Sequence, residues 1–136
     1  MNFTDLERRL HPAEELRRGD WHRHKRGGGW IENSAVVAAT AYIGPYAIVL
    51  RRAHVLDEAE IRDDTIVTAG AIVAGRVYAG GKSRIGDLAK ISGTARIIDA
   101  DVGGYAVIAE GLLTGTVYRP RSLQAWKTWK AAILVR

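Results

Sequence analysis

Hydrophobic residues recur at every sixth position through the middle of the chain. Between residues 31 and 97 this position is Ile or Val eleven times in twelve, and Ala79 is the exception. Four residues after most of these positions comes a second series of small residues, mainly Ala. An α-helix repeats every 3.6 residues and a β-strand every 2, so neither holds this register for so long. A fixed short period over half a chain predicts a solenoid of stacked coils.

The six-residue period predicts an all-β solenoid with a triangular cross-section. Each hexapeptide supplies a short strand and a bend, and about three hexapeptides complete one coil. Successive coils then pair through parallel backbone hydrogen bonds. The large aliphatic residue points inward from the strand, and the small residue occupies the tight corner. Residues 31–118 are long enough for nearly five coils.

The register slips once, near the end of the repeat. Asp101 and Gly103 cannot both lie in an apolar core, so we expect the rung after Ile97 to be one residue short. The segment Asp99–Asp101 then forms a bulge or shortened rung. The corrected register places Val102 and Ile108 at the large positions and Ala106 and Leu112 at the small ones.

Two hexapeptides carry a family resemblance. Ile43–Ala47 (IGPYA) and Ile85–Ala89 (IGDLA) resemble the repeat of hexapeptide-repeat proteins. This resemblance implies a left-handed parallel β-helix, although the general rule for parallel crossovers favours a right-handed coil. It also implies a homotrimer with coils side by side. The segment His22–Trp30 is similar to the leader of a group of phage and bacterial hexapeptide-repeat proteins, which implies a phage-encoded accessory or host-interfering protein.

The repeat divides the chain into three parts. Residues 1–30 form a helical leader and a basic, glycine-rich connection, residues 31–118 form the β-helix, and residues 119–136 form a basic tail. Within the leader we expect a helix over residues 4–18, capped by Thr4 with Glu7, restarted at Pro12 and ended by Gly19. The tail has apolar residues at helical spacing after Ser122, which favours a helix laid over the coil. Its β-branched end, Ile133–Val135, favours a strand instead.

Composition restricts the chemistry. The chain has no cysteine, which excludes disulfides and thiolate sites, and it has no apolar run long enough to span a bilayer. We therefore expect a cytoplasmic protein without a membrane partner. The net charge of +5 is uneven, because residues 119–136 carry five Lys/Arg and no Asp/Glu. The basic tail residues Arg119, Arg121, Lys127 and Lys130, interleaved with Trp126 and Trp129, suit nucleic-acid binding, whereas a solvated end or burial of the tryptophans also explains them.

Outward residues fall onto three faces, because each face recurs about every 18 residues. Just before the inward aliphatics stand Trp30, Ile48, Ile66 and Arg84 on the first face, Val36, His54, Ile72 and Lys90 on the second, and Tyr42, Glu60, Tyr78 and Arg96 on the third. External apolar residues on the first two faces require a cover. We expect the C-terminal helix to cover one face and a neighbouring subunit another, with an oligomer interface formed by Trp30, Ile48, Ile66, Val36 and Ile72.

The third face has the composition of a binding site. Tyr42 and Tyr78 flank Glu60 there, with Arg62 and Arg96 close by, and this combination suits a small ligand or a partner protein. The alternative is a solvated face with a cross-coil ion pair between Glu60 and Arg96, which contributes little to stability.

Histidine decides whether an enzyme is plausible. The resembling acyltransferases use a His as general base beside an acyl-CoA slot between subunits, and His54 is the only His in this repeat. An exposed His beside Arg51 and Arg52 also suits a structural or interfacial role. The related γ-class carbonic anhydrases bind zinc through three His at coil spacing, which one His cannot supply. The repeat also runs from 31 to 97 without the protruding acceptor loop that such transferases often carry.

The leader offers weak alternatives. His22 and His24 stand among cations, which makes a poor metal site, and Lys25–Gly29 lacks the spacing of a phosphate-binding P-loop, which favours a flexible basic connection. We therefore predict a non-enzymatic trimeric β-helix that binds a macromolecule or ligand, with neither metal nor cofactor. The alternatives are an acyl-CoA-dependent acyltransferase with His54 as base, and nucleic-acid binding through the tail.

Overall fold

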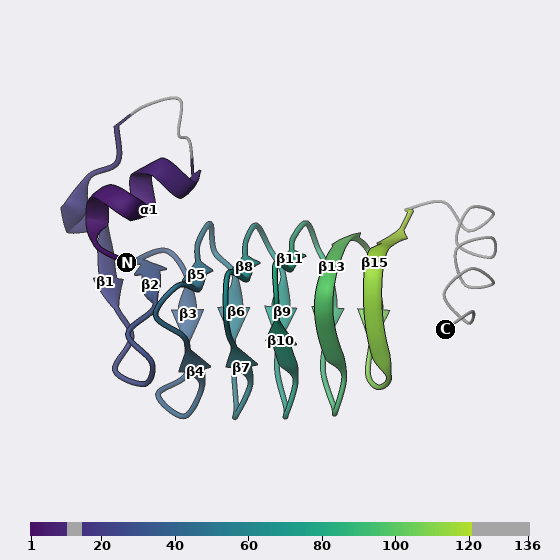
Figure 1. The fold of residues 1–136 in the computed structure, drawn as a ribbon. Helices are drawn as coiled ribbons and strands as arrows, with labels where there is room; N and C mark the ends of the chain where they lie inside the picture. Colours follow the sequence, from purple (N-terminus) through teal and green to yellow (C-terminus); the bar gives the residue numbers. More distant parts are fainter. Residues whose placement is uncertain (11–14, 121–136) are drawn as a thin grey trace.

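The computed structural model of the chain is a parallel β-solenoid of about five turns with one short N-terminal helix (Figure 1). It describes residues 1–10 and 15–120. The predicted all-β solenoid is confirmed. The expected C-terminal helix or strand lies outside the described residues. Within the described residues, no helix has the length and apolarity needed to cross a membrane.

Three faces make up each coil, and strands of one face pair in parallel from coil to coil. Face A holds β2 (Trp30–Glu32), β5 (Ile48–Val49), β8 (Ile66–Val67) and β11 (Arg84–Ile85). Face B holds β3 (Val36–Val37), β6 (His54–Val55), β9 (Ile72–Val73), β12 (Lys90–Ile91) and β14 (Val107–Ile108). Face C holds β4 (Tyr42–Ile43), β7 (Glu60–Ile61) and β10 (Tyr78–Gly80). The longer strands β13 (Arg96–Gly104) and β15 (Leu112–Arg119) run around the corner from face C to face A.

The core follows the six-residue register. The large inward positions and the small corner positions are both buried, for example Ile61 and Ala59, each fully inaccessible. One coil exchanges the two sizes, since Val77 stands at the corner and Ala79 on the strand, and both are buried. The exchange conserves volume, which explains how the repeat tolerates its one exception.

Aspartate shapes several corners. Asp57, Asp63, Asp87 and Asp99 all adopt positive φ angles between 49° and 57°. Each carboxylate also accepts a backbone N–H from an adjacent coil, donated by Gly75, Gly81, Gly104 and Lys82 respectively at 2.8–2.9 Å. Aspartate tolerates the left-handed conformation better than most residues and supplies an acceptor there. These corners therefore bend the chain and join neighbouring coils with the same residue.

The predicted register slip is confirmed, and a second one follows it. Ile97 pairs with Ala79, 18 residues earlier, whereas Val102 pairs with Ile85, only 17 residues earlier, and Val102 and Ile108 are buried as expected. The expected inner position of Leu112 is wrong, since Leu112 is 48% exposed and Leu113 is 5% exposed. The rung after Ile108 is also one residue short, which moves the inward side chain by one position.

The N-terminal helix is shorter than expected. α1 spans Phe3–Leu10, residues 15–17 are not helical, and a 3-10 turn covers Arg18–Asp20. The expected capping pair, Thr4 with Glu7, is wrong. Asn2 and Asp5 cap the helix instead, because each side chain accepts the other residue's backbone N–H at 2.8 and 3.0 Å.

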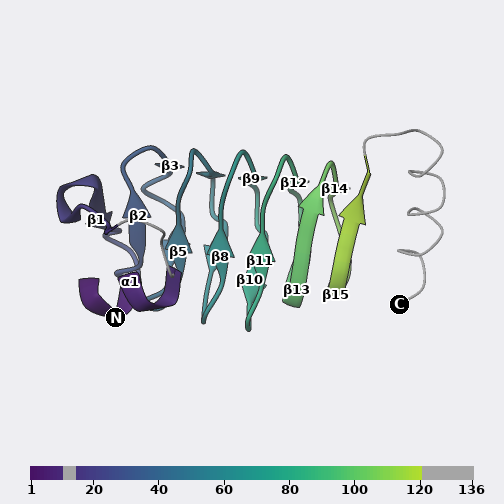
Figure 2. The same ribbon diagram turned by 90° about the horizontal axis from the view of Figure 1, so that it is seen from above.

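α1 covers the N-terminal part of face A (Figure 2). Leu6 is fully buried in a cluster with Trp30, Ile48 and Leu50, and the Phe3 ring meets Trp30 edge to face at 5.8 Å. Trp30 and Ile48 were expected on an open surface that a C-terminal helix or a neighbour would cover. The chain's own N-terminal helix covers them, because its apolar stripe matches the outward apolar row of face A.

The glycine-rich segment closes the N-terminal end of the solenoid. β1 (Trp21–Arg23) pairs antiparallel with β2, and the connection between them bonds to the first coil through Gly29 N–H to Ile43 O and Ile43 N–H to Arg26 O. A Cβ on Gly27 would lie 2.0 Å from Ile43 O. The segment therefore needs glycine for close packing, and the expectation of a flexible connection is wrong.

Candidate functional site

Face C brings together the predicted binding residues. In the ladder from β4 to β13, Tyr42 pairs with Glu60, Glu60 with Tyr78, and Tyr78 with Arg96. These outward side chains lie in one row because their spacing equals one full coil. The sequence-based prediction that they share a face is confirmed, while their role in binding stays a prediction.

Arg62 links two members of the row. Its guanidinium lies 4.2 Å from the centroid of the Tyr42 ring, and its Nε and Nη2 atoms donate to Glu60 Oε1 at 2.9 and 2.6 Å. The hydrogen bond to Glu60 is the main cause that raises the pKa of Arg62, which therefore stays charged. About 40% of both side chains remains accessible. The group is held in place and still faces solvent.

Arg96 repeats the motif one coil further on. Its guanidinium lies 4.7 Å from the centroid of the Tyr78 ring. The expected alternative, an ion pair between Glu60 and Arg96, is not formed, because Glu60 is engaged by Arg62 and Arg96 stacks on tyrosine. Face C therefore presents two guanidinium groups stacked on tyrosine rings with one carboxylate between them.

The outward row of face B alternates apolar and polar residues: Val36, Ile72 and Val107 form its apolar row, and His54 and the exposed Lys90 stand between them. Val36 and Val107 are 49% and 56% exposed, and half-buried Ile72 lies between them along the face. His54 pairs with Val36 and Ile72 in the ladder, and its buried Nδ1 has no hydrogen-bond partner within residues 1–10 and 15–120. Among the described residues, nothing covers this face as α1 covers face A.

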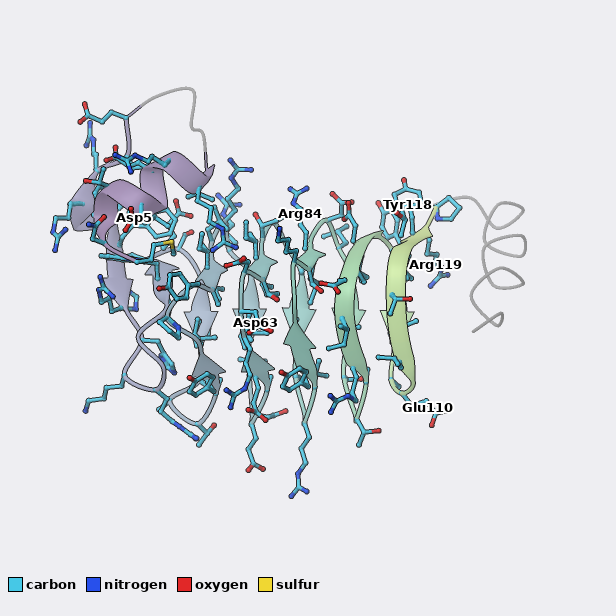
Figure 3. The ribbon with its side chains drawn as sticks, in the orientation of Figure 1. Asp5, Asp63, Arg84, Glu110, Tyr118 and Arg119 are labelled. Atoms are coloured by element: carbon cyan, nitrogen blue, oxygen red, sulfur yellow. The ribbon has the colours of Figure 1, made fainter. Side chains whose placement is uncertain are left out.

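A groove follows the corner between faces A and B. It has a volume of about 450 Å³ and is lined by Ala69, Gly70, Asp87, Leu88, Gly104, Tyr105 and Tyr118. Leu88 and Tyr118 are each about half exposed, and Tyr118 lies on β15 near the C-terminal end of the described coils (Figure 3). A second hollow of about 240 Å³ shares Leu88 and Tyr105 and extends to Lys90 and Val107 on face B. The groove therefore borders the uncovered face.

The histidines of the leader have local partners. His22 Nδ1 lies 2.6 Å from Asn33 Oδ1, and His24 Nε2 donates to Ala41 O at 2.8 Å. Over residues 1–10 and 15–120, no three His, Cys, Asp or Glu side chains are grouped as a metal site. Both histidines thus help to fasten the leader to the first coils.

Only the first part of the basic tail lies within the described residues. Arg119 ends β15 and is half-buried, whereas Arg121, Lys127 and Lys130 lie outside the described residues. Nucleic-acid binding through these residues stays a prediction.

Sequence reasoning missed a second charged region. Arg9 of α1 donates to the backbone carbonyls of Tyr46 and Asp64, more than 35 residues away. Arg9 precedes the repeat and follows no six-residue spacing, so no signal in the sequence connects it with face A.

Comparison with protein-family models, curated proteins and solved structures found no match to this chain.

Proposed function

We propose that the protein is a non-enzymatic, self-associating β-helix that presents a binding face to a partner. Its coils assemble through face B into a homotrimer, and the tyrosine–arginine row of face C contacts a partner macromolecule or ligand. The resemblance to left-handed hexapeptide-repeat proteins, and to their phage and bacterial group, supports the trimer and an accessory, host-interfering role.

The exposed apolar row on face B carries this proposal. The N-terminal part of face A has the same kind of row, and α1 buries it there, with Ile48 fully inaccessible. Val36 and Val107 on face B instead leave about half of their surface in water. Burial of such a row contributes roughly 25 cal/mol per Å² of apolar surface, which favours contact with neighbouring copies of the chain arranged around a symmetry axis.

The test is the mass in solution. We expect light scattering to give about three times the chain mass of 14.9 kDa for the wild type and the single-chain mass for Ile72→Glu, which places a charge in the apolar row. Arg96→Ala on face C is the matched control and should stay trimeric. A monomeric wild type would overturn the trimer.

The partner is identified by comparing two baits. A pull-down from the native host with the wild type and with the Arg62→Ala, Arg96→Ala double variant should retain the partner only on the wild type. Equal retention by both baits would remove face C from the proposal.

A second candidate function, acyl-CoA-dependent acyl transfer, is favoured by the position of His54. It lies between Val36 and Ile72 in the middle of face B, where a neighbouring subunit would border it. Its buried, unpartnered Nδ1 leaves one ring nitrogen without a fixed role. Calorimetry with acetyl-CoA tests this candidate. The absence of a measurable heat of binding to the wild-type protein would eliminate it.

A further inference from the structure

A small cavity lies at the C-terminal end of α1, where the helix meets face A. It has a volume of about 200 Å³ and is lined by Arg9 and Leu10 of the helix and by Leu50, Arg51, Ile66, Thr68 and Arg84 of the coils. Arg84 projects from β11 on the side of the solenoid that carries α1 (Figure 3). This cavity is separate from faces B and C.

The charged side chains that line the cavity are all positive. Three arginines line it, and none of the lining residues is acidic. Arg9 already has an acidic partner, since its Nη1 lies 3.8 Å from Asp64 Oδ1, and it is anchored to two backbone carbonyls. Burial is the main cause that lowers the pKa of Arg9, and the Asp64 carboxylate opposes that effect.

The other two arginines are available. Among the described residues, the Arg51 and Arg84 side chains form no ion pair with an acidic group. Arg84 stands in the ladder between Ile66 and Asp101, without a contact to the Asp101 carboxylate within ion-pair distance. Glu32 accepts from the backbone N–H of Arg51 at 2.8 Å, and the Arg51 guanidinium has no partner among the described residues.

Thr68 adds an independent observation. The residue is 2% exposed, lines the cavity, and its hydroxyl has no hydrogen-bond partner in the part of the chain that the structure describes. A buried hydroxyl without a partner costs about 1–3 kcal/mol, so such groups are normally satisfied. A turn of the Thr68 side chain toward the cavity would let a ligand oxygen satisfy it.

We propose that this cavity binds a small phosphate monoester. A dianionic phosphate matches several arginines, whose guanidinium groups bind it through paired hydrogen bonds. The Thr68 hydroxyl donates to a phosphate oxygen, and Leu10, Leu50 and Ile66 contact a short apolar substituent. The volume lies below the range of about 300–1,000 Å³ that takes drug-sized ligands, which restricts the substituent to a small one.

Calorimetric titration of the full chain with phenyl phosphate tests the site, with benzoate and phenol as charge controls. We expect phenyl phosphate to bind at least tenfold more tightly than benzoate, and phenol to show no binding. Raising the salt concentration should weaken the binding. Equal affinity for benzoate, or no binding of phenyl phosphate at millimolar concentration, would overturn the assignment.

Paired variants separate the site from general effects on the fold. Thr68→Val and Arg84→Ala should each weaken binding about tenfold. Thr65→Val removes another buried, unpartnered hydroxyl that does not line the cavity, and Arg76→Ala removes an arginine elsewhere, so both should bind as the wild type does. Wild-type affinity of Thr68→Val, with unchanged unfolding, contradicts the proposal.

The face B variant keeps this inference distinct from the proposed function. The cavity is built within one chain, so Ile72→Glu should bind phenyl phosphate with wild-type affinity. Loss of binding in that variant, with its secondary structure retained, would place the site at an interface and overturn the proposal.

Discussion

Asp57 and Gly75 are joined from one coil to the next: the Asp57 carboxylate accepts the Gly75 backbone N–H at 2.9 Å, 18 residues along the chain. Both residues have positive φ angles, 57° and 73°. One side chain therefore favours the bend at its own corner and holds the corner above it. The same arrangement joins Asp63 to Gly81.

Replacing Asp57 should lower stability in a graded way. Asp57→Ala removes the acceptor and places Ala in the left-handed region, which should reduce the free energy of unfolding by about 1–2 kcal/mol. Asp57→Asn keeps an acceptor oxygen and a residue that tolerates this region, and should cost less than about 0.5 kcal/mol. Urea unfolding measures both. Asp101→Ala, at an exposed position with no such bond, is the control, and equal losses from Asp57→Ala and Asp101→Ala would contradict the corner role.

Gly93 and Gly115 separate backbone strain from steric contact. Both have positive φ, but a Cβ on Gly93 would lie 2.2 Å from Ala109 O, whereas nothing lies within 4 Å of a Cβ on Gly115. We expect Gly115→Ala to cost about 1–2 kcal/mol of unfolding free energy from the φ angle alone. Gly93→Ala should cost clearly more. Thermal unfolding midpoints that fall equally for both variants would show that the coils move apart easily.

Leu6→Ala should weaken the packing of α1 on face A. Leu6 of α1 is fully buried in the cluster that contains Trp30, and removing such a side chain costs about 2–5 kcal/mol. We expect a change in Trp fluorescence at lower urea than the unfolding of the coils, because α1 contacts only the first part of the solenoid. Arg8→Ala, on the exposed side of the same helix, should leave both transitions unchanged. A single unshifted transition for Leu6→Ala would show that α1 contributes little.

Arg62 should matter little for stability. Its side chain and that of Glu60 are about 40% exposed, so the ion pair and the contact with Tyr42 together contribute no more than about 1 kcal/mol. Arg62→Ala should therefore unfold within that margin of the wild type in urea. A larger loss of unfolding free energy would show that Arg62 supports the fold. A loss of partner binding in an Arg62 variant could then not be assigned to a direct contact through face C.

Much of the fold and part of the candidate site could be predicted from the period alone. Tyr42, Glu60 and Tyr78 share a face because 18 residues make one coil, and counting is enough to see it. The contacts of Arg62 with Tyr42 and Glu60 could not be predicted, because they depend on which way a long, flexible side chain turns. The position of Leu112 was missed because a second short rung leaves no mark in the spacing.

The sequence by itself determined the solenoid, since burial of Ile and Val at every sixth position admits no other regular structure. It also determined the first slip, because Asp101 cannot lie in an apolar core. Only the tertiary structure decided which face is covered and by what. Contacts of α1 with Ile48 and of Arg9 with Asp64 join residues outside the repeat to residues inside it, and no local pattern encodes such pairs. The cavity lined by Thr68 forms only because the C-terminal end of α1 packs against the coils.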